Sequence, residues 1–204
     1  GDDDIGKLAD FEILPVGDIH QAVDIRRVAL AAGNRPVLID FIDQQAGGMK
    51  GGAKLKSYSP GGSSSGFLPA AAADTPLDFK AMADQGSMLG SGAVVAVAEP
   101  TCMLDLALNA VTFFRNESCG KCVPCRVGSE KIVDILLRAT RGQGTAHDLA
   151  LIDEIAHTMR DTSICGLGQA APYPITSVIK HFKSEVDDHI LKRRCPSGVC
   201  LAQP

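Results

Sequence analysis

The sequence has little net charge, no long hydrophobic run and no secretory signal. Its 204 residues carry a formal charge of −4 at pH 7, which argues against nucleic acid or an anionic membrane surface as the partner. The longest apolar stretches, such as residues 93–98, are far too short to span a bilayer. The N-terminus lacks the basic start and apolar core of a signal peptide. We therefore expect a cytoplasmic protein without direct membrane insertion.

An initiator methionine is also absent, because the chain begins Gly1-Asp-Asp-Asp4. We expect the chain to be trimmed, or to be one piece of a longer protein. With 45% hydrophobic residues it can bury a core, as one large domain or two small ones. Cysteine is missing from residues 1–99, whereas residues 101–204 hold all seven cysteines. This division predicts two modules, of which the second carries the cysteine chemistry.

Hydrophobic periodicity predicts that the first module is a small α+β domain. Asp18 and Gln21 fit the capping box of a first helix, and Gly33 fits its end. A second, short helix follows, and two segments rich in β-branched and small apolar residues fit strands. The predicted helices lie at residues 18–32 and 37–45, and the predicted strands at residues 54–59 and 93–98.

The second module has the pattern of a four-helix bundle. Thr101 fits the N-cap of the first helix, Thr145 with Asp148 opens the third, and Pro124 is expected to hold a loop open before the second begins. Each helix carries an apolar face, and four amphipathic helices of this length favour a bundle. The apolar faces cover residues 103–114, 126–140, 149–159 and 175–190.

Four cysteines form an iron–sulfur signature. Cys119, Cys122 and Cys125 are spaced C-x2-C-x2-C, and Cys165 follows with 39 residues between. Thiolates three residues apart at the mouth of a helix converge on one cubane, whose fourth corner is bound from elsewhere in the fold. A structural zinc site would more often pair two C-x2-C knuckles. Disulfides conflict with three thiols so close together in a chain without a secretory signal.

These motifs resemble the C-terminal cluster domain of the NADH-binding flavoprotein subunit of respiratory complex I. The same domain occurs in diaphorase subunits of NAD-linked hydrogenases and formate dehydrogenases. The strings that carry the resemblance are Glu117-Ser-Cys-Gly-Lys-Cys-Val-Pro-Cys-Arg126 and Cys165-Gly-Leu-Gly-Gln-Ala-Ala-Pro172. Upstream, three segments resemble the small β-grasp domain, of SLBB type, that precedes the cluster domain in this family: residues 60–69, 74–78 and 86–92. The resemblance runs from about Gly47 to His189.

The resemblance implies an α+β protein in which an SLBB-like β-grasp domain precedes a four-helix bundle binding an iron–sulfur cluster. The implied division is a poorly assigned segment 1–46, a β-grasp domain 47–100, a [4Fe–4S] domain 101–193 and a cysteine-containing tail 194–204. Cys119, Cys122, Cys125 and Cys165 are the implied cluster ligands. In the family the cluster takes electrons from FMN, which NADH has reduced, and passes them to other subunits of a redox complex.

The chain departs from the family because it lacks the glycine-rich fingerprint of the FMN- and NADH-binding domain. Residues 61–66 are rich in glycine but do not have the fingerprint spacing. We therefore expect FMN and NADH to bind in a partner or in a missing segment, and no complete site for them in these residues. The implied partners are the flavin-binding part and ferredoxin-like subunits.

Three cysteines remain, and their role has three interpretations. Cys102, Cys195 and Cys200 are free thiols in the simplest one. In the second, they form a closed tetrahedral zinc site with His189 that ties the tail to the bundle. In the third, they bind a second iron–sulfur centre, because a similar Cys-Pro-x-Gly-x-Cys tail precedes further cluster domains in hydrogenase-type relatives.

The sequence thus predicts an electron-transfer module of a multisubunit NAD(H)-linked oxidoreductase of the NADH dehydrogenase or diaphorase type. The alternative is a structural or docking subunit, in which the cluster only fastens two loops together. The ligands are the same in both cases.

Overall fold

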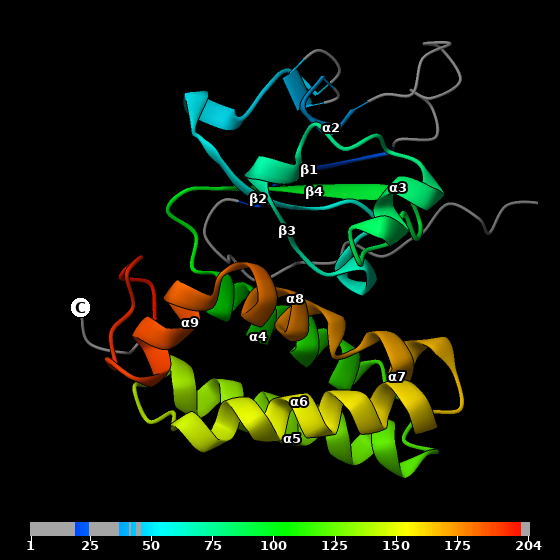
Figure 1. Cartoon of the computed structure of the whole chain (residues 1–204), viewed down its shortest axis with the longest axis vertical. Coiled ribbons are helices and arrows are strands. Elements are labelled where there is room, and N and C mark those ends of the chain that lie inside the picture. The colour runs from blue at the N-terminus through cyan, green and yellow to red at the C-terminus, as the bar shows by residue number, and fades with distance from the viewer. Residues whose placement is uncertain (1–18, 25–36, 41, 44–45, 201–204) are drawn as a thin grey trace, which may run out of the picture.

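The computed structural model describes residues 19–24, 37–40, 42–43 and 46–200. In these residues a small sheet with short helices forms one layer, and longer helices form a second layer beneath it (Figure 1). The expected α+β fold, a β-grasp-like sheet domain followed by a four-helix bundle, is confirmed. Within the same ranges, no helix combines the length and the apolar character needed to cross a membrane.

The sheet is antiparallel and has the order β1-β4-β2-β3 within the described residues. The central strand β4 consists of valine and alanine only, and it pairs with β1 on one side and β2 on the other. The strands are β1 (Ile19–Asp24), β2 (Leu55–Ser59), β3 (Leu68–Pro69) and β4 (Ala93–Ala98). The predictions of strands at 54–59 and 93–98 are confirmed.

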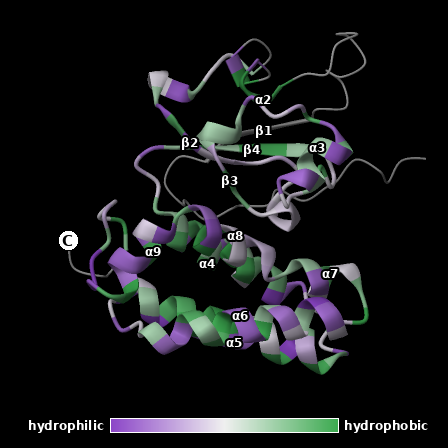
Figure 2. Ribbon diagram, in the orientation of Figure 1, coloured by the Kyte–Doolittle hydropathy of each residue, from purple (hydrophilic) through white to green (hydrophobic). Residues whose placement is uncertain are grey.

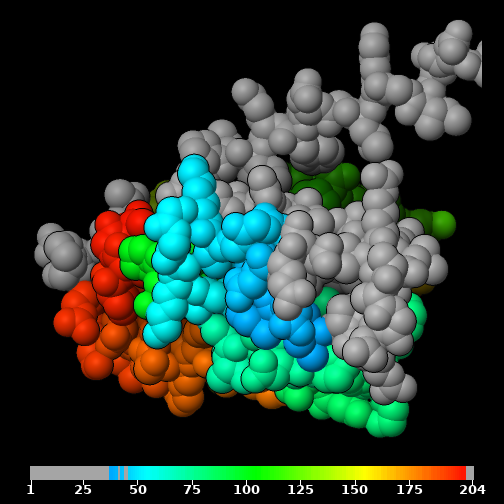
Figure 3. Space-filling view, turned by 90° about the horizontal axis from the view of Figure 1, so that it is seen from above, coloured from blue at the N-terminus to red at the C-terminus, as the bar shows by residue number. Residues whose placement is uncertain are grey.

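Short helical turns cover this sheet and enclose its own hydrophobic core. Asp78 caps α3, because its side chain accepts the backbone N–H of Ala81 at 2.7 Å. Tyr58, Leu68 and Met82 are among the fully buried side chains of this core. The turns are α2 (Leu38–Asp40), η2 (Lys50–Gly52), η3 (Ser63–Ser65), η4 (Ala70–Ala72) and α3 (Phe79–Asp84). Seen from above, this layer forms one face, with the C-terminal segment at its edge (Figure 3).

The bundle consists of α4, α5, α6 and the pair α8 and α9, with the short α7 between α6 and α8. Figure 2 shows apolar residues concentrated along these helices and along β4. Ile132, Leu136 and Ile175 are among its fully buried side chains. The helices are α4 (Met103–Asn116), α5 (Val123–Thr140), α6 (Ala146–Thr162), α7 (Gly166–Ala170), α8 (Tyr173–His181) and α9 (Lys183–Ile190).

The two layers are joined by polar contacts as well as by apolar packing. The backbone N–H of Phe67 donates to Ser177 Oγ at 2.8 Å. Gly66 has a φ of +67°, and a Cβ added there would lie 2.8 Å from Ser177 Oγ. Because only glycine tolerates this backbone conformation at such a short approach, Gly66 allows the loop after η3 to rest on α8.

Several predicted elements differ from the structure. Residues 19–24 form β1 rather than part of a helix, because pairing with β4 outweighs local helix propensity. The rest of the predicted helix 18–32, including its capping residue Asp18 and the stop at Gly33, lies outside the described residues. The predicted helix 37–45 is confirmed at Leu38–Asp40 and, as a π-helical turn, at residues 42–43, while residues 41, 44 and 45 lie outside the described residues.

Differences in the bundle concern helix ends. Cys102, not Thr101, is the N-cap of α4, and its Sγ accepts the backbone N–H of Asp105 at 3.5 Å. Pro124 lies in the first turn of α5 and does not precede the helix, since proline suits the first turn, where no intrahelical N–H bond is lost. The predicted fourth helix is broken at Phe182, whose backbone leaves the helical region at φ −124° and ψ 35°.

Candidate iron–sulfur and metal sites

The seven cysteines form two groups at opposite ends of the bundle. Cys102 precedes α4, and Cys119 follows its C-terminus. The 14 residues of α4 correspond to a length of about 21 Å. Figure 1 shows α7 at one end of the bundle and α9 with the C-terminal segment at the other. Cys165 directly precedes α7, whereas Cys195 and Cys200 follow α9. The two groups therefore make two separate centres.

The first group is positioned by the N-terminal ends of α5 and α7. Cys122 is the N-cap of α5, Cys125 lies in its first turn, and Cys165 is the N-cap of α7. Cys119 lies in the loop between α4 and α5. Cys125 is buried, Cys122 is half-buried, and Cys119 and Cys165 are exposed. The group therefore reaches from the protein interior to the surface.

The two cysteine loops touch each other. The pKa of the Cys122 thiol is lowered, first of all by a hydrogen bond from the backbone N–H of Ile164, the residue before Cys165. Backbone N–H groups of Cys125 and Cys122 add to this effect, as does the Ser163 hydroxyl, while burial opposes it. The thiolate is the form that binds iron, so the local hydrogen bonds favour the state that ligation needs.

Gly168 permits this close approach of α7 to α5. A Cβ added to Gly168 would lie 2.6 Å from Ser163 Oγ and 2.8 Å from Cys125 Cβ, which no real Cβ tolerates. The absence of a side chain at Gly168 therefore lets the loop of Cys165 pack against the first turn of α5.

The loop around Gly120 adds positive charge and hydrogen-bond donors. Gly120 has a φ of +72°, and its carbonyl oxygen accepts a hydrogen bond from the Arg126 guanidinium. Ser118 Oγ lies 3.3 Å from Cys125 Sγ. Lys121, in the same loop, is exposed. Positive charge and hydrogen bonds near an iron–sulfur cluster favour its reduced, more negative state.

The residues of this group fit a four-iron cluster. Three thiols of the right spacing lie at one helix N-terminus, a fourth comes from a loop in contact with it, and a buried hydroxyl of Ser163 makes no hydrogen bond of normal geometry within the described residues. The four sulfur atoms do not converge within single-ion distance. A cubane does not require this, because each thiolate binds a different iron.

The second group has the geometry of a single-ion site. The ligand atoms of Cys102, His189, Cys195 and Cys200 all lie within 4.8 Å of one another, and the described residues hold no other such group. Cys102 Sγ lies 3.4 Å from His189 Nε2 and 3.5 Å from Cys200 Sγ. Ligands of a tetrahedral zinc ion, bound at about 2.3 Å through sulfur and 2.0 Å through nitrogen, lie about 3.5–3.8 Å apart. The donor set fits zinc.

Hydrogen bonding inside this group shifts the pKa values of its side chains. The hydrogen bond from the Cys200 thiol, together with His189 and the backbone of Asp105, outweighs burial and lowers the pKa of Cys102 to about 4. Burial alone would lower the pKa of His189, but the hydrogen bonds to Cys102 and to the Glu185 carbonyl raise it to about 9. The pKa of Cys200 is raised by the Cys102 thiolate beside it. Cys102 therefore favours the thiolate form that a metal ion binds.

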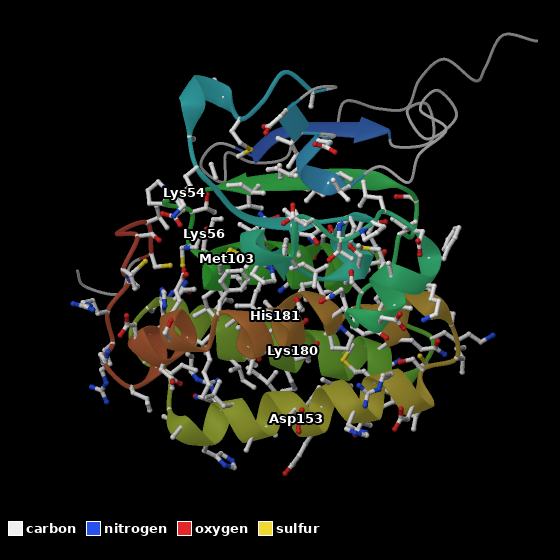
Figure 4. The ribbon with its side chains drawn as sticks, turned by 45° about the horizontal axis from the view of Figure 1, so that its top comes forward. Lys54, Lys56, Met103, Asp153, Lys180 and His181 are labelled. Carbon is white, nitrogen blue, oxygen red and sulfur yellow. The ribbon has the colours of Figure 1, made fainter. Side chains whose placement is uncertain are left out.

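A partly buried ion pair supports this second group from outside. His189 Nδ1 lies 2.8 Å from the Glu185 carbonyl oxygen, which directs Nε2 toward the cysteines. The Glu185 carboxylate accepts the backbone N–H of Met103 at 2.7 Å and lies 2.8 Å from Lys56 Nζ. Lys56 also donates to the Thr101 carbonyl at 2.5 Å. Lys56 and Met103 lie beside each other where the sheet layer meets the bundle (Figure 4).

Sequence reasoning singled out the cysteines of both groups and His189 of the second group, but not Lys56 or Glu185. Cysteine spacing drew attention to the first group and the three remaining cysteines to the second, whereas Lys56 belongs to β2 and Glu185 to α9. A lysine and a glutamate so far apart in the sequence carry no local signal that they meet.

Comparison with known proteins supports the interpretation of the first group. Residues 105–189 match the family model described as the NADH-ubiquinone oxidoreductase-F iron–sulfur binding region. The resemblance predicted from the sequence is confirmed. The matched region contains Cys119, Cys122, Cys125 and Cys165.

Curated relatives extend the match toward the N-terminus. The chain is 36% identical over 182 residues to the NADP-reducing hydrogenase subunit HndC of Solidesulfovibrio fructosivorans, covering 89% of this chain and 36% of that protein. It is 37% identical over 155 residues to the mitochondrial NADH-ubiquinone oxidoreductase 51 kDa subunit of Neurospora crassa, covering 75% of this chain and 31% of that protein. The chain thus spans about a third of the length of these relatives.

A solved structure has the same fold. A chain of the NAD+-reducing [NiFe]-hydrogenase, crystallised in the H2-reduced state, superposes with a TM-score of 0.67 at 26% identity. The superposition covers 76% of this chain and 26% of the hydrogenase chain. The arrangement of sheet and bundle is therefore shared with a redox enzyme.

Proposed function

We propose that this chain is an electron-transfer module of a multisubunit NAD(H)-linked oxidoreductase. It holds one [4Fe–4S] cluster on Cys119, Cys122, Cys125 and Cys165. The observation that carries the proposal is the contact between the two cysteine loops, where Gly168 packs so closely against Ser163 and Cys125 that an added Cβ would lie 2.6 and 2.8 Å from them. The match of residues 105–189 to an iron–sulfur binding region supports the same cluster.

The chain's own residues have distinct roles in this proposal. When bound, the cluster accepts and returns one electron at a time. Cys125 anchors the interior side, while Cys119 and Cys165 are exposed and bring the centre to the protein surface. Arg126, fixed to the Gly120 carbonyl, keeps a positive charge beside the site. This arrangement suits exchange of electrons with a partner at the α7 end of the bundle.

The source of the electrons lies outside this chain in the proposal. FMN and NADH bind in a partner or a segment that these residues do not include, and ferredoxin-like subunits are the further partners. The names of the relatives, which belong to an NADP-reducing hydrogenase and to a mitochondrial NADH-ubiquinone oxidoreductase, support this assignment. We also propose that the [4Fe–4S] domain covers residues 101–193 and that the location is cytoplasmic. The expected β-grasp limits 47–100 are too narrow, because β1 at Ile19–Asp24 pairs with β4 in the same sheet.

The alternative is a structural role in which the cluster only fastens the two cysteine loops. The exposure of Cys119 and Cys165 favours electron transfer, because a purely structural centre gains nothing from reaching the surface.

Iron analysis of the full chain, reconstituted anaerobically, tests the cluster ligands. We expect about four irons per chain and, after dithionite reduction, the electron paramagnetic resonance signal of a reduced [4Fe–4S] cluster. Cys165→Ala is expected to lose that signal, whereas the control Cys195→Ala keeps it. Four irons retained by Cys165→Ala would contradict the ligand assignment.

We further propose that Cys102, His189, Cys195 and Cys200 bind one structural zinc ion. The specific observation is the approach of all four ligand atoms within 4.8 Å of one another, with three of the four residues buried. Three thiolates and one imidazole leave no open position for water, so the ion would fix the C-terminal segment to α4 and α9 without taking part in redox chemistry. Elemental analysis is expected to find about one zinc per chain besides the iron. No zinc would favour free thiols, and about eight irons would favour a second cluster.

A further inference from the structure

Ser163 carries a buried hydroxyl that the rest of the described protein leaves without a well-formed hydrogen bond. The residue is 5% exposed, and its Oγ has no hydrogen-bond partner of normal geometry in the described ranges. A buried hydroxyl without a partner is unfavourable, and such a group in a folded protein calls for an explanation.

The backbone of Ser163, in contrast, is fully bonded. Its N–H donates to the Met159 carbonyl at 3.0 Å, which ends α6. Its carbonyl accepts the side-chain amide of Gln169 at 3.1 Å. These two bonds hold the backbone of Ser163 in place from both sides, so the buried hydroxyl starts from a well-anchored residue.

The hydroxyl lies at the cluster cysteines. Ser163 and Cys125 both pack against Gly168, since a Cβ added there would meet Ser163 Oγ at 2.6 Å and Cys125 Cβ at 2.8 Å. Ser163 lies two residues before Cys165, in the loop that joins α6 to α7. The Ser163 hydroxyl therefore shares one small packed region with Cys125, a ligand of the proposed cluster.

We infer that Ser163 donates its hydroxyl hydrogen bond to a sulfur atom of the cluster, either the Cys122 thiolate or an inorganic sulfide, and thereby raises the reduction potential. A hydrogen bond to sulfur stabilises the added negative charge of the reduced cluster more than the oxidised cluster. The inference rests on the proposed function, because it requires a cluster on Cys119, Cys122, Cys125 and Cys165. Ser163 acts through the cluster and is a tuning residue.

Ser129 provides a matched control. It is also a fully buried serine close to Cys125, but its Oγ donates to the Cys125 carbonyl at 2.7 Å. Removing the hydroxyl of Ser129 therefore deletes a buried polar group near the cluster without removing a donor to sulfur. A change seen in both alanine variants would reflect general loosening rather than a lost hydrogen bond.

The test is a redox titration of the reconstituted full chain, followed by electron paramagnetic resonance of the reduced cluster. Iron is counted in every sample. We expect Ser163→Ala to keep about four irons and to be reduced with an equilibrium constant about tenfold smaller, which equals a potential ~59 mV lower. Ser163→Thr, which keeps the hydroxyl, and Ser129→Ala are expected to stay near the wild-type potential. If the equilibrium constant for reduction of Ser163→Ala lies within twofold of the wild-type value, the inference is overturned.

A second measurement decides the matter if Ser163→Ala does not retain its iron. In a structure of the cluster-loaded wild-type chain, Ser163 Oγ is expected within hydrogen-bond distance of a cluster or cysteine sulfur. A hydroxyl turned toward a backbone carbonyl or a water would overturn the inference, while the proposed function would stand. A wild-type chain that binds no iron would instead overturn the proposed function, and the inference with it.

Discussion

The ion pair of Lys56 and Glu185 should be a main energetic link between the sheet layer and the bundle. Replacing Lys56 with methionine keeps the aliphatic stem but removes the charge and the hydrogen bond to the Thr101 carbonyl. The Glu185 carboxylate would then stay buried without its cationic partner, while it still accepts the backbone N–H of Met103.

The geometry sets the expected magnitude. At the observed 2.8 Å between Nζ and Oε2, Coulomb attraction with an effective dielectric constant of about 20 amounts to roughly 6 kcal/mol before desolvation is subtracted. Breaking a buried pair by removing one partner costs about 3–5 kcal/mol. Because the two side chains are 15% and 11% exposed, we expect Lys56→Met to lower the free energy of unfolding by about 2–4 kcal/mol.

Urea denaturation of the metal-loaded full chain measures this loss. The matched control is Lys54→Met, which removes an exposed lysine just before the same strand (Figure 4) and should change stability by less than about 0.5 kcal/mol. Glu185→Gln keeps an oxygen for the Met103 N–H, and the double variant K56M/E185Q should show a coupling energy of about 1–3 kcal/mol. If Lys56→Met costs no more than Lys54→Met, the ion pair does not join the two layers.

Three further changes test other parts of the structure. Gly168→Ala should lower the free energy of unfolding by about 1–3 kcal/mol through overpacking, and it should reduce the iron content. In the control Gly166→Ala an added Cβ meets nothing within 4 Å, so its thermal stability should be nearly unchanged. Equal effects of the two changes would contradict the argument that α7 approaches α5 closely at Gly168. Burial raises the pKa of Asp148, but hydrogen bonds from Thr145 and the charge of Arg138 outweigh it and lower the pKa overall. The extra stability of the wild type relative to Asp148→Asn should therefore be complete above about pH 4 and should disappear as the pH falls through the folded-state pKa of Asp148. If the difference in urea midpoint between the two proteins is the same at pH 7 and at pH 3, this reasoning is refuted. Removing zinc with a chelator should lower the unfolding temperature without changing the resonance signal of the iron cluster, and loss of that signal would contradict a purely structural zinc site.

Features encoded by local sequence were predicted well. The strand at residues 93–98 was predicted with the bounds of β4, because its valines and its flanking Gly92 and Pro100 act within a few residues. The capping box of Thr145 and Asp148 was predicted for the same reason, and it is present at the start of α6. The C-x2-C-x2-C spacing likewise singled out Cys119, Cys122 and Cys125, because it is a property of a short segment.

Features that depend on distant parts of the chain were missed. Residues 19–24 have a helix-like pattern but form β1, because β4 offers backbone hydrogen bonds that only the folded sheet creates. The break at Phe182 and the short helix α7 were likewise not predicted. The hydroxyl of Ser163 and the ion pair of Lys56 and Glu185 have meaning only once separate elements meet.

The central claim, that the chain passes electrons through its cluster, is tested most directly in the intact complex. Electron paramagnetic resonance after addition of NADH should reveal the reduced [4Fe–4S] cluster of this chain, with the signal absent when Cys165 is replaced by alanine and present in the control Cys195→Ala. A cluster that dithionite reduces but NADH does not would contradict electron transfer and favour a structural role.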